Sequence, residues 1–408
     1  MQKLFLTSIL LFGLLYVNAQ YTISGKIVSA DTKQPIASAS VFFSNTSKGN
    51  ATNNEGGFIL DNIGAGKVEL VVSCVGYETY LLQIQPEKIT SPLRIELQIM
   101  VKPLEEIVVS GYVKEGWFTW GDFFIDNFIG TNPYASNCKI KNPKVIQFRN
   151  YKKEGVLKAF ADETLEIENK SLGYIIHYKL ELFEYNFISE MVVYRGYALF
   201  ENMQTKSDAL KKRWKANREK VYYGSRMHFM RSLFRNKIAE EGFEIRRVVK
   251  IPNLELQRVK TLYSKYFSHP GILNTNDILK QDIYKDSIPY FISILNQDNT
   301  IDFAYRTLLT RDSVAYFVDT VTAGMKFSDY LLITYTKTIE DQAYVKGYNL
   351  QRLPKPPSSS VTLINNSSIE IFGNGAIYEG LDLLHSGYWS WSESTATLLP
   401  FDYWPNNK

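Results

Sequence analysis

Short apolar runs separated by turn residues fill the chain between residues 23 and 77. The runs cover residues 23–28, 39–43, 58–60 and 68–75. Gly, Asn, Asp or Pro stands between successive runs. Strands that recur about every 8–12 residues between such turns are typical of a small β-sandwich. We therefore predict an all-β domain over residues 20–99.

Several residues of this region have the spacing of a known module. They are Gly25, Pro35, Gly49, Thr52, Gly57, Phe58, Gly66, Val75, Gly76 and Tyr77. With these positions, residues 23–97 resemble the carboxypeptidase regulatory-like module, a seven-stranded transthyretin-like sandwich that bacterial envelope proteins carry at their N-termini. Asn53 stands where the family usually has Asp, and an Asn side chain closes the same kind of turn. The resemblance implies a fold and an envelope context but no activity, because the module accompanies peptidases, transporters and other proteins alike.

An apolar run covers residues 4–17 and is followed by a small-residue site before Gln20. This pattern is typical of a secretory signal, and the run is shorter than the about 20 residues of a membrane-spanning helix. We predict that residues 1–19 are removed and that the protein is exported to the periplasm or outer membrane of a Gram-negative bacterium. No Cys precedes Cys74, so the expected new N-terminus offers no lipid-attachment site.

Residues 100–116 are predicted to link the sandwich to the rest of the chain. Within them, residues 104–112 place an acidic pair before a β-branched run, which indicates an exposed strand or strand-forming linker. The same stretch resembles the segment that joins this module to the plug of TonB-dependent outer-membrane receptors. We reject a receptor, because a barrel needs many alternating strands of about 10 residues and the following region contains a long basic helical stretch.

Residues 117–352 predict a larger α+β domain with an antiparallel sheet. Alternating runs cover residues 144–148, 156–160, 164–167, 174–183 and 191–200. Asp162, Thr164, Glu166 and Glu168 fall on one side of the third run, with apolar residues on the other, which is typical of a solvated strand.

Other parts of this region allow more than one interpretation. Residues 122–128 fit a short helix or a buried entry segment, and residues 254–263 fit a strand or a helix. We expect residues 353–360 to be a Pro/Ser loop and residues 361–408 to be the C-terminal β-rich part of the large domain. The aromatic run at 388–391 is expected to cover a core rather than to stack on a glycan.

Residues 207–242 have the pattern of two helices. Ser207 is suited to cap a first helix that runs to about Lys220. Gly224 and Ser225 would end it and cap a second helix, which would run to about Glu241 before Gly242. We predict a basic helical pair packed on the sheet.

The charge of this pair sets it apart from the rest of the chain. Residues 206–237 contain eleven Lys and Arg but only two acidic residues, Asp208 and Glu219. Their net charge is therefore +9, against +4 for all 408 residues. Like charges at helical spacing repel one another, and an anionic partner that faces them would offset this repulsion. The candidate anion- or partner-binding residues are Lys211, Lys215, Arg218, Arg226, Arg231 and Arg235. The alternative is an ordinary solvated face neutralised by Glu166 and Glu168.

Motifs of known chemistry are absent from the sequence. The four His residues are widely separated, and neither a His-Glu-x-x-His helix nor a His-x-x-Glu pair occurs. A Gly-x-Ser-x-Gly elbow, a P-loop and a dinucleotide fingerprint are also missing. We therefore predict no catalytic, cofactor or metal residues. Cys74 and Cys138 are too few for a disulfide framework and are expected to be free thiols.

Two classes of function fit these observations. The first is a non-enzymatic cell-envelope protein that binds a protein, a glycan or an anionic envelope component. The second is an unrecognised envelope hydrolase with the sandwich as an accessory domain. Export argues against nucleic acid as a partner, and the lack of a second long apolar run limits membrane association to a peripheral one.

Overall fold

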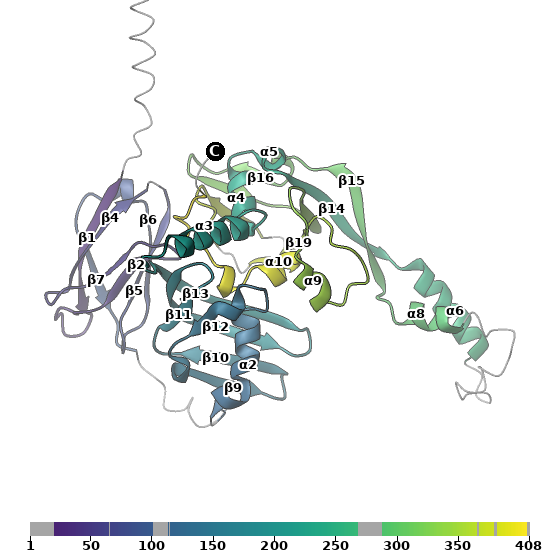
Figure 1. Ribbon diagram of the computed structural model, residues 1–408, viewed down its shortest axis with the longest axis horizontal. Coiled ribbons are helices and arrows are strands. Elements are labelled where there is room, and N and C mark those ends of the chain that lie inside the picture. The colour runs from purple at the N-terminus through teal and green to yellow at the C-terminus, as the bar shows by residue number, and fades with distance from the viewer. Residues whose placement is uncertain are drawn as a thin grey trace, which may run out of the picture.

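The computed structural model describes residues 20–64, 66–100, 113, 115–267, 288–364, 367–378 and 382–405. The predicted signal at 1–19 and the predicted linker strand at 104–112 lie outside these residues. The described chain forms five β-sheets with helices packed against them (Figure 1).

Two small sheets form the N-terminal sandwich. The first, in the order β4-β1-β7, consists of β1 (Tyr21–Ser29), β4 (Gly57–Ile63) and β7 (Leu93–Leu97). The second, in the order β3-β2-β5-β6, consists of β2 (Ser40–Phe43), β3 (Gly49–Ala51), β5 (Val68–Ser73) and β6 (Tyr80–Ile84). The inward side chains of the two sheets meet in a buried core that includes Ile27, Val41, Leu70 and Ile95.

Local polar contacts fix the corner before β4. The Asn53 Oδ1 atom accepts hydrogen bonds from the backbone N–H groups of Glu55 (3.1 Å) and Gly57 (2.7 Å). The Thr52 hydroxyl donates to the Ile36 carbonyl at 2.7 Å and accepts from the Ala39 N–H at 2.9 Å. The side-chain turn expected of Asn53 is therefore confirmed.

A six-stranded antiparallel sheet follows the sandwich. Its strands are β8 (Cys138–Ile140), β9 (Ile146–Tyr151), β10 (Val156–Ala161), β11 (Leu165–Asn169), β12 (Tyr174–Asn186) and β13 (Met191–Asn202). The order is β8-β11-β12-β10-β9, with β13 on the other edge of β12. The predicted runs are strands, but the sheet is not a simple meander because different halves of β12 pair with β11 and β10.

Helix α2 (Gly116–Phe128) packs on this sheet and is longer than the helix considered at 122–128. Its Phe124 and Phe128 are fully buried, and Phe124 lies 4.7 Å from Phe183 of β12, ring centre to ring centre. These aromatic residues belong to the core of the six-stranded sheet.

The last two sheets share a second core. One, in the order β15-β14-β18-β19-β22, consists of β14 (Phe243–Pro252), β15 (Thr300–Leu308), β18 (Tyr330–Tyr335), β19 (Ser358–Leu363) and β22 (Leu383–Gly387). The other, in the order β16-β17-β20-β21, consists of β16 (Ala315–Phe317), β17 (Thr322–Met325), β20 (Ile369–Phe372) and β21 (Ile377–Tyr378). The predicted large domain thus contains two separate cores.

The remaining helices surround these sheets. They are α3 (Asp208–Tyr222), α4 (Arg226–Phe234), α5 (Ile238–Glu241), α6 (Leu254–Phe267), α8 (Ile288–Leu295), α9 (Gln342–Gly347) and α10 (Tyr388–Ser392). In Figure 1, the β14–β15 ribbon projects from the body as an arm that carries α6 and α8 at its end. Leu256, Val259 and Ile294 give these two helices a small core of their own.

Two expectations change with these bounds, and one open interpretation is decided. The single helix expected after Ser225 is broken into α4 and α5, with Asn236 at φ 55° between them. Residues 254–263 are helical, within α6. Residues 358–360, expected in a loop, begin β19 instead, because their backbones pair with β18.

Two other expectations agree with the structure. Trp389 and Trp391 are buried at 3% and 8% exposure, so the aromatic run at 388–391 does cover a core. Cys74 and Cys138 are free. No helix in the described part of the chain is long and apolar enough to cross a membrane.

Candidate functional site

Helix α3 is fixed to the six-stranded sheet by polar contacts along one side. Its N-cap residue Ser207 accepts a hydrogen bond from the Leu210 N–H at 3.3 Å. Trp214 is buried, and its indole N–H donates to the Lys170 carbonyl at 2.9 Å. Asn217 donates to the Ser171 carbonyl at 2.7 Å. The opposite side of α3 is therefore presented to solvent.

A cleft of about 570 Å³, which we call the α3 cleft, lies beside this helix. It is lined by Lys211, Trp214, Lys215 and Arg218 of α3, by Tyr174 and Asn202 of the sheet and residues 203–205 after it, by Ser47 of the sandwich, and by Pro400 and residues 402–404. Three of the six predicted cations thus meet in one cavity.

The three cations differ in whether their charged groups are already bonded to other residues. Lys211 is exposed and lies 3.3 Å from the Asp208 carboxylate. Lys215 is exposed and has no hydrogen-bond or ion-pair partner among the described residues. Two lysines are therefore available to a ligand, since an exposed ion pair such as that of Lys211 is weak.

Arg218 forms part of the wall of the cleft. Its guanidinium donates to the carbonyls of Leu172 (2.7 Å) and Gly173 (3.0 Å) and to the Asn202 Oδ1 atom (3.1 Å). It also lies 3.7 Å from the centre of the Tyr174 ring. Most of its donors are thus used to join α3 to the ends of β12 and β13.

Arg231 is not on any surface, which corrects its prediction as an anion- or partner-binding residue. Its side chain is fully buried and donates to the carbonyls of Asn374 (2.8 Å), Tyr403 (3.0 Å) and Phe401 (3.1 Å). The guanidinium lies 3.7 Å from the centre of the Trp404 ring. Arg231 therefore holds the C-terminal segment that forms one wall of the α3 cleft, and Trp404, at 45% exposure, faces solvent there.

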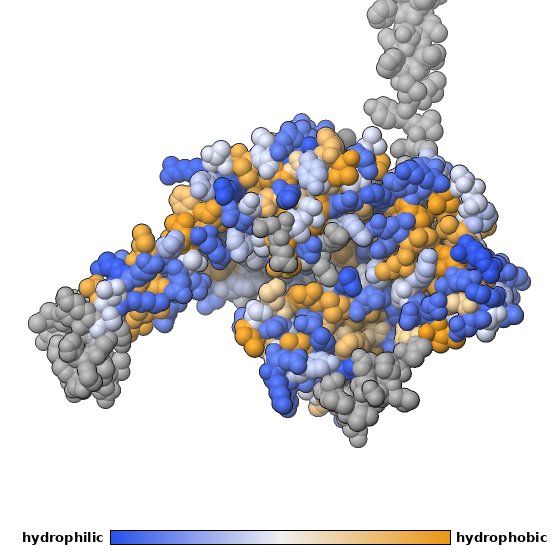
Figure 2. All heavy atoms as spheres, turned by 180° about the vertical axis from the view of Figure 1, so that it is seen from behind, coloured by the Kyte–Doolittle hydropathy of each residue, from blue (hydrophilic) through white to orange (hydrophobic). Residues whose placement is uncertain are grey.

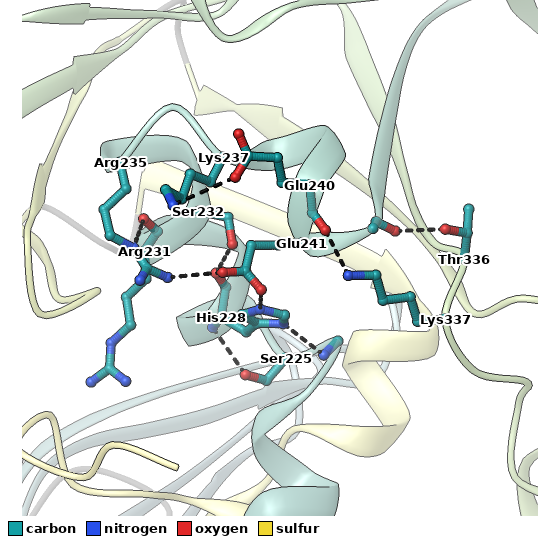
Figure 3. Close-up of polar contacts among 12 residues, drawn as sticks. Ser225, His228, Arg231, Ser232, Arg235, Lys237, Glu240, Glu241, Thr336 and Lys337 are labelled. Carbon is teal, nitrogen blue, oxygen red and sulfur yellow. Dashed lines mark hydrogen bonds and ion pairs between the residues drawn. The ribbon is translucent and has the colours of Figure 1, made fainter. Parts of the chain in front are cut away.

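Arg226 and Arg235 lie away from the cleft lining. Arg226 contacts the Glu393 carboxylate with its backbone N–H and, at 3.5 Å, with its Nε atom. Arg235 lies 3.5 Å from Glu241, near the buried His228 (Figure 3). The six candidates therefore do not form one continuous surface.

Glu166 and Glu168 do not neutralise the helices. Glu168 lies 3.2 Å from Lys170 and 3.9 Å from Lys141, both outside the helical region. The carboxylates that pair with the Lys and Arg residues of the helical region come instead from Asp208, Glu240, Glu241, Asp341 and Glu393. Asp341 and Glu393 could not be identified from local spacing, because they lie more than 100 residues further along the chain than their partners Lys220 and Arg226.

The sandwich supplies the last wall of the cleft. The Ser47 N–H donates to the Asp402 carboxylate at 2.9 Å, and the Ser47 hydroxyl donates to the same group. The Phe401 N–H donates to the Asn45 carbonyl at 2.7 Å. The only carboxylate in the cleft lining is therefore already engaged with the sandwich.

The lining of the α3 cleft offers polar, charged and aromatic groups to a ligand. It contains cations, amides, hydroxyls and aromatic rings, but neither a His nor a pair of carboxylates that could share acid and base roles. Among the described residues, no three His, Cys, Asp or Glu side chains are placed to hold a metal ion. Sequence analysis did not identify the contributions of Ser47, Asn202 and Gln204, since nothing in their local pattern marks them.

Comparison with known proteins gives a family for the N-terminal part and little for the rest. Residues 23–109 match the family of CarboxypepD_reg-like domains. No curated protein matches the chain.

Solved structures give only distant similarities. A cohesin–X-dockerin complex from Acetivibrio cellulolyticus is 26% identical over 19% of this chain and 51% of that chain, about half its length, with a TM-score of 0.15. A candidate membrane-associated protein of unknown function from Bacteroides fragilis is 12% identical over 86% of this chain and 93% of that chain, with a TM-score of 0.16. A 9R-lipoxygenase from Cyanothece is 10% identical over 53% and 49%, with a TM-score of 0.15.

These TM-scores are too low to support a common architecture or function. The family match, in contrast, falls on the sandwich that the residues themselves predicted. The N-terminal part of this chain, residues 23–109, is therefore a carboxypeptidase regulatory-like domain.

Proposed function

We propose that this chain is a non-enzymatic, exported cell-envelope protein that binds an acidic glycan in the α3 cleft. The observation that carries the proposal is the meeting of two available lysines, Lys211 and Lys215, with the half-exposed Trp404 ring in one cavity. Export rests on the apolar run at residues 4–17.

The lining supports an acidic sugar polymer over other anions. Lysine side chains attract carboxylate or phosphate groups, while the face of an aromatic ring packs against the apolar face of a sugar. Asn202, Gln204 and Thr205 add amide and hydroxyl groups that match sugar hydroxyls. A simple inorganic anion would use the lysines but leave Trp404 without a role.

The test changes the two lysines and leaves Arg231 intact, because reversing a buried Arg would disrupt the fold. The double variant Lys211→Glu, Lys215→Glu should lose about tenfold or more of its retention on isolated envelope fractions at low salt. The matched control is Lys152→Glu, Lys153→Glu, which makes the same change of charge at two exposed lysines of the β9–β10 turn.

Comparison of the two double variants distinguishes binding at a specific site from attraction by net charge. Loss in the cleft variant alone supports the proposal, and Trp404→Ala should then weaken retention as well. Equal loss in both double variants would indicate attraction by net charge only. Unchanged retention of the cleft variant would mean that α3 presents an ordinary solvated face.

A further inference from the structure

Strand β15 forms one edge of the five-stranded sheet and is exposed along its whole length. Ile301, Phe303 and Tyr305 alternate along it at 46%, 47% and 42% exposure. Hydrophobic residues are visible along the projecting arm in Figure 2, among hydrophilic ones. Natural edge strands are often protected from pairing by prolines, charged side chains or bulges. Thr300–Leu308 contains no proline, and its irregularity lies beyond Ala304.

The backbone of β15 has unused hydrogen-bonding groups. The Asn253 N–H donates to the Asn299 carbonyl at 2.9 Å, and the ladder with β14 is regular from Thr300 to Ala304. Antiparallel strands bond through alternate residues. The N–H and C=O groups of Thr300, Asp302 and Ala304 therefore point away from β14, toward the open edge.

The sequence of the strand is complementary to itself. Antiparallel pairing of two copies about a two-fold axis at Ala304 places Asp302 of each copy opposite Arg306 of the other, and Phe303 opposite Tyr305. We propose that β15 pairs in this way with β15 of a second copy of the chain, which joins two five-stranded sheets into one. Such an interface is isologous, so each contact occurs twice.

Charge favours this register over those with an axis at Asp302 or Thr300. An axis at Asp302 would set two Asp302 carboxylates against each other, and an axis at Thr300 would set Asp302 against Asp298. Like charges opposite one another in a ladder are unfavourable, whereas opposite charges and aromatic pairs stabilise it. The axis at Ala304 is therefore the favoured one of these three.

The charged groups are available for this contact. Arg306 is exposed and has no hydrogen-bond or ion-pair partner among the described residues. Asp302 lies 3.6 Å from Lys250, in a pair that is largely exposed. Since the β14 register shifts beyond Ala304, Arg306 is expected to contribute its side-chain charge, while Ala304 supplies the central backbone bonds. A single strand edge buries little area, so the dimer should be weak and dependent on concentration.

Sedimentation velocity of the purified protein over a range of concentrations tests the proposal. The wild type should form dimers, and Asp302→Arg or Arg306→Asp alone should weaken association about tenfold or more. The double variant Asp302→Arg, Arg306→Asp restores both ion pairs with reversed polarity and should dimerise again. Ala304→Pro should give a monomer with an unchanged fold, because it removes only an outward N–H.

Each alternative outcome overturns the pairing. A wild type that stays monomeric at the highest concentration excludes it. A dimer that persists in Ala304→Pro places the interface elsewhere, and failure of the double variant to recover excludes the register at Ala304. Circular dichroism and thermal melting of every variant exclude misfolding as the cause of a lost dimer.

Discussion

His228 is a buried residue of α4 whose hydrogen bonds and burial determine its protonation state. It is 1% exposed, and its Nδ1 atom accepts a hydrogen bond from the Gly224 N–H at 3.1 Å. The proton of the neutral ring therefore lies on Nε2, which donates to the Glu241 carboxylate at 3.3 Å (Figure 3). Burial is the main cause that lowers the pKa of His228 to about 4, against the opposing effect of Glu241.

This lowered pKa predicts a pH-dependent stability. The folded protein binds fewer protons at His228 than the unfolded chain does, whose pKa is about 6.5. The contribution is full above pH 6.5 and is lost as the pH falls toward 4. We expect a loss on the order of 1–3 kcal/mol in the free energy of unfolding over this range.

Urea unfolding at several pH values measures this loss. His228→Gln should flatten the pH dependence of the free energy of unfolding. His385, whose pKa burial lowers to about 3, acts in the same direction, so the flattening should be partial. An unchanged slope in His228→Gln would contradict the assignment.

Residues whose partners are close in the chain could be predicted from the sequence. The Asn53 turn and the caps Ser207 and Ser225 each bond to an N–H no more than four residues away. Arg231 could not be predicted in this way, because its three acceptors lie 143, 170 and 172 residues further on. In a basic stretch, a buried Arg has the same local pattern as an exposed one.

At the level of elements, the break between α4 and α5 has a physical cause that periodicity does not reveal. Phe234 and Ile238 keep helical spacing, yet α4 ends at Phe234 and the Lys237 N–H donates to the Ser232 carbonyl at 2.8 Å. The turn brings Glu241 back to both His228 and Arg235. The hydrogen bond to the neutral His228 and the ion pair with Arg235 thus stabilise the broken arrangement, although the apolar pattern fits a single continuous helix.

Arg231 joins α4, the turn after β20 and the C-terminal segment, so its replacement should loosen all three. We predict that Arg231→Lys lowers the free energy of unfolding by about 2–4 kcal/mol. One ammonium cannot reproduce the planar donors to three carbonyls, and buried acceptors left without a donor are costly. Arg235→Lys, at the exposed C-cap position of α4, should cost less than about 0.5 kcal/mol. Similar losses of unfolding free energy for both variants, measured in urea, would contradict this role of Arg231.

The sandwich packs on the six-stranded sheet in the whole molecule. Phe42 and Val71 of the sandwich are buried against Tyr197 and Leu199 of β13, and the Phe200 N–H donates to the Thr46 carbonyl at 2.9 Å. Residues 41–43 are apolar on both sides of the strand, which indicates burial on two faces. The sequence therefore contained a sign of this contact, but local pattern could not identify β13 as the partner or show that the contact completes the α3 cleft.

This arrangement leads to a prediction about the independence of the sandwich. Residues 20–99 have their own core and contain no His, so the isolated sandwich should melt cooperatively with or without a chelator. In the full chain, Phe42→Ala should lower the free energy of unfolding by about 2–4 kcal/mol, because it leaves a cavity against Tyr197. In the isolated sandwich the same change should cost less than about 1 kcal/mol, since Phe42 is there exposed to solvent.

Urea unfolding of both forms compares these losses, with Ile59→Ala as the control because Ile59 is 55% exposed on the other sheet. The control should be close to neutral in both forms. An equal loss for Phe42→Ala in the two forms would show that Phe42 stabilises the sandwich itself rather than its docking. A chelator-dependent melting temperature would contradict a metal-free fold.

If docking holds the Ser47 wall in place, Phe42→Ala should also weaken retention on envelope fractions although it lies outside the cleft lining.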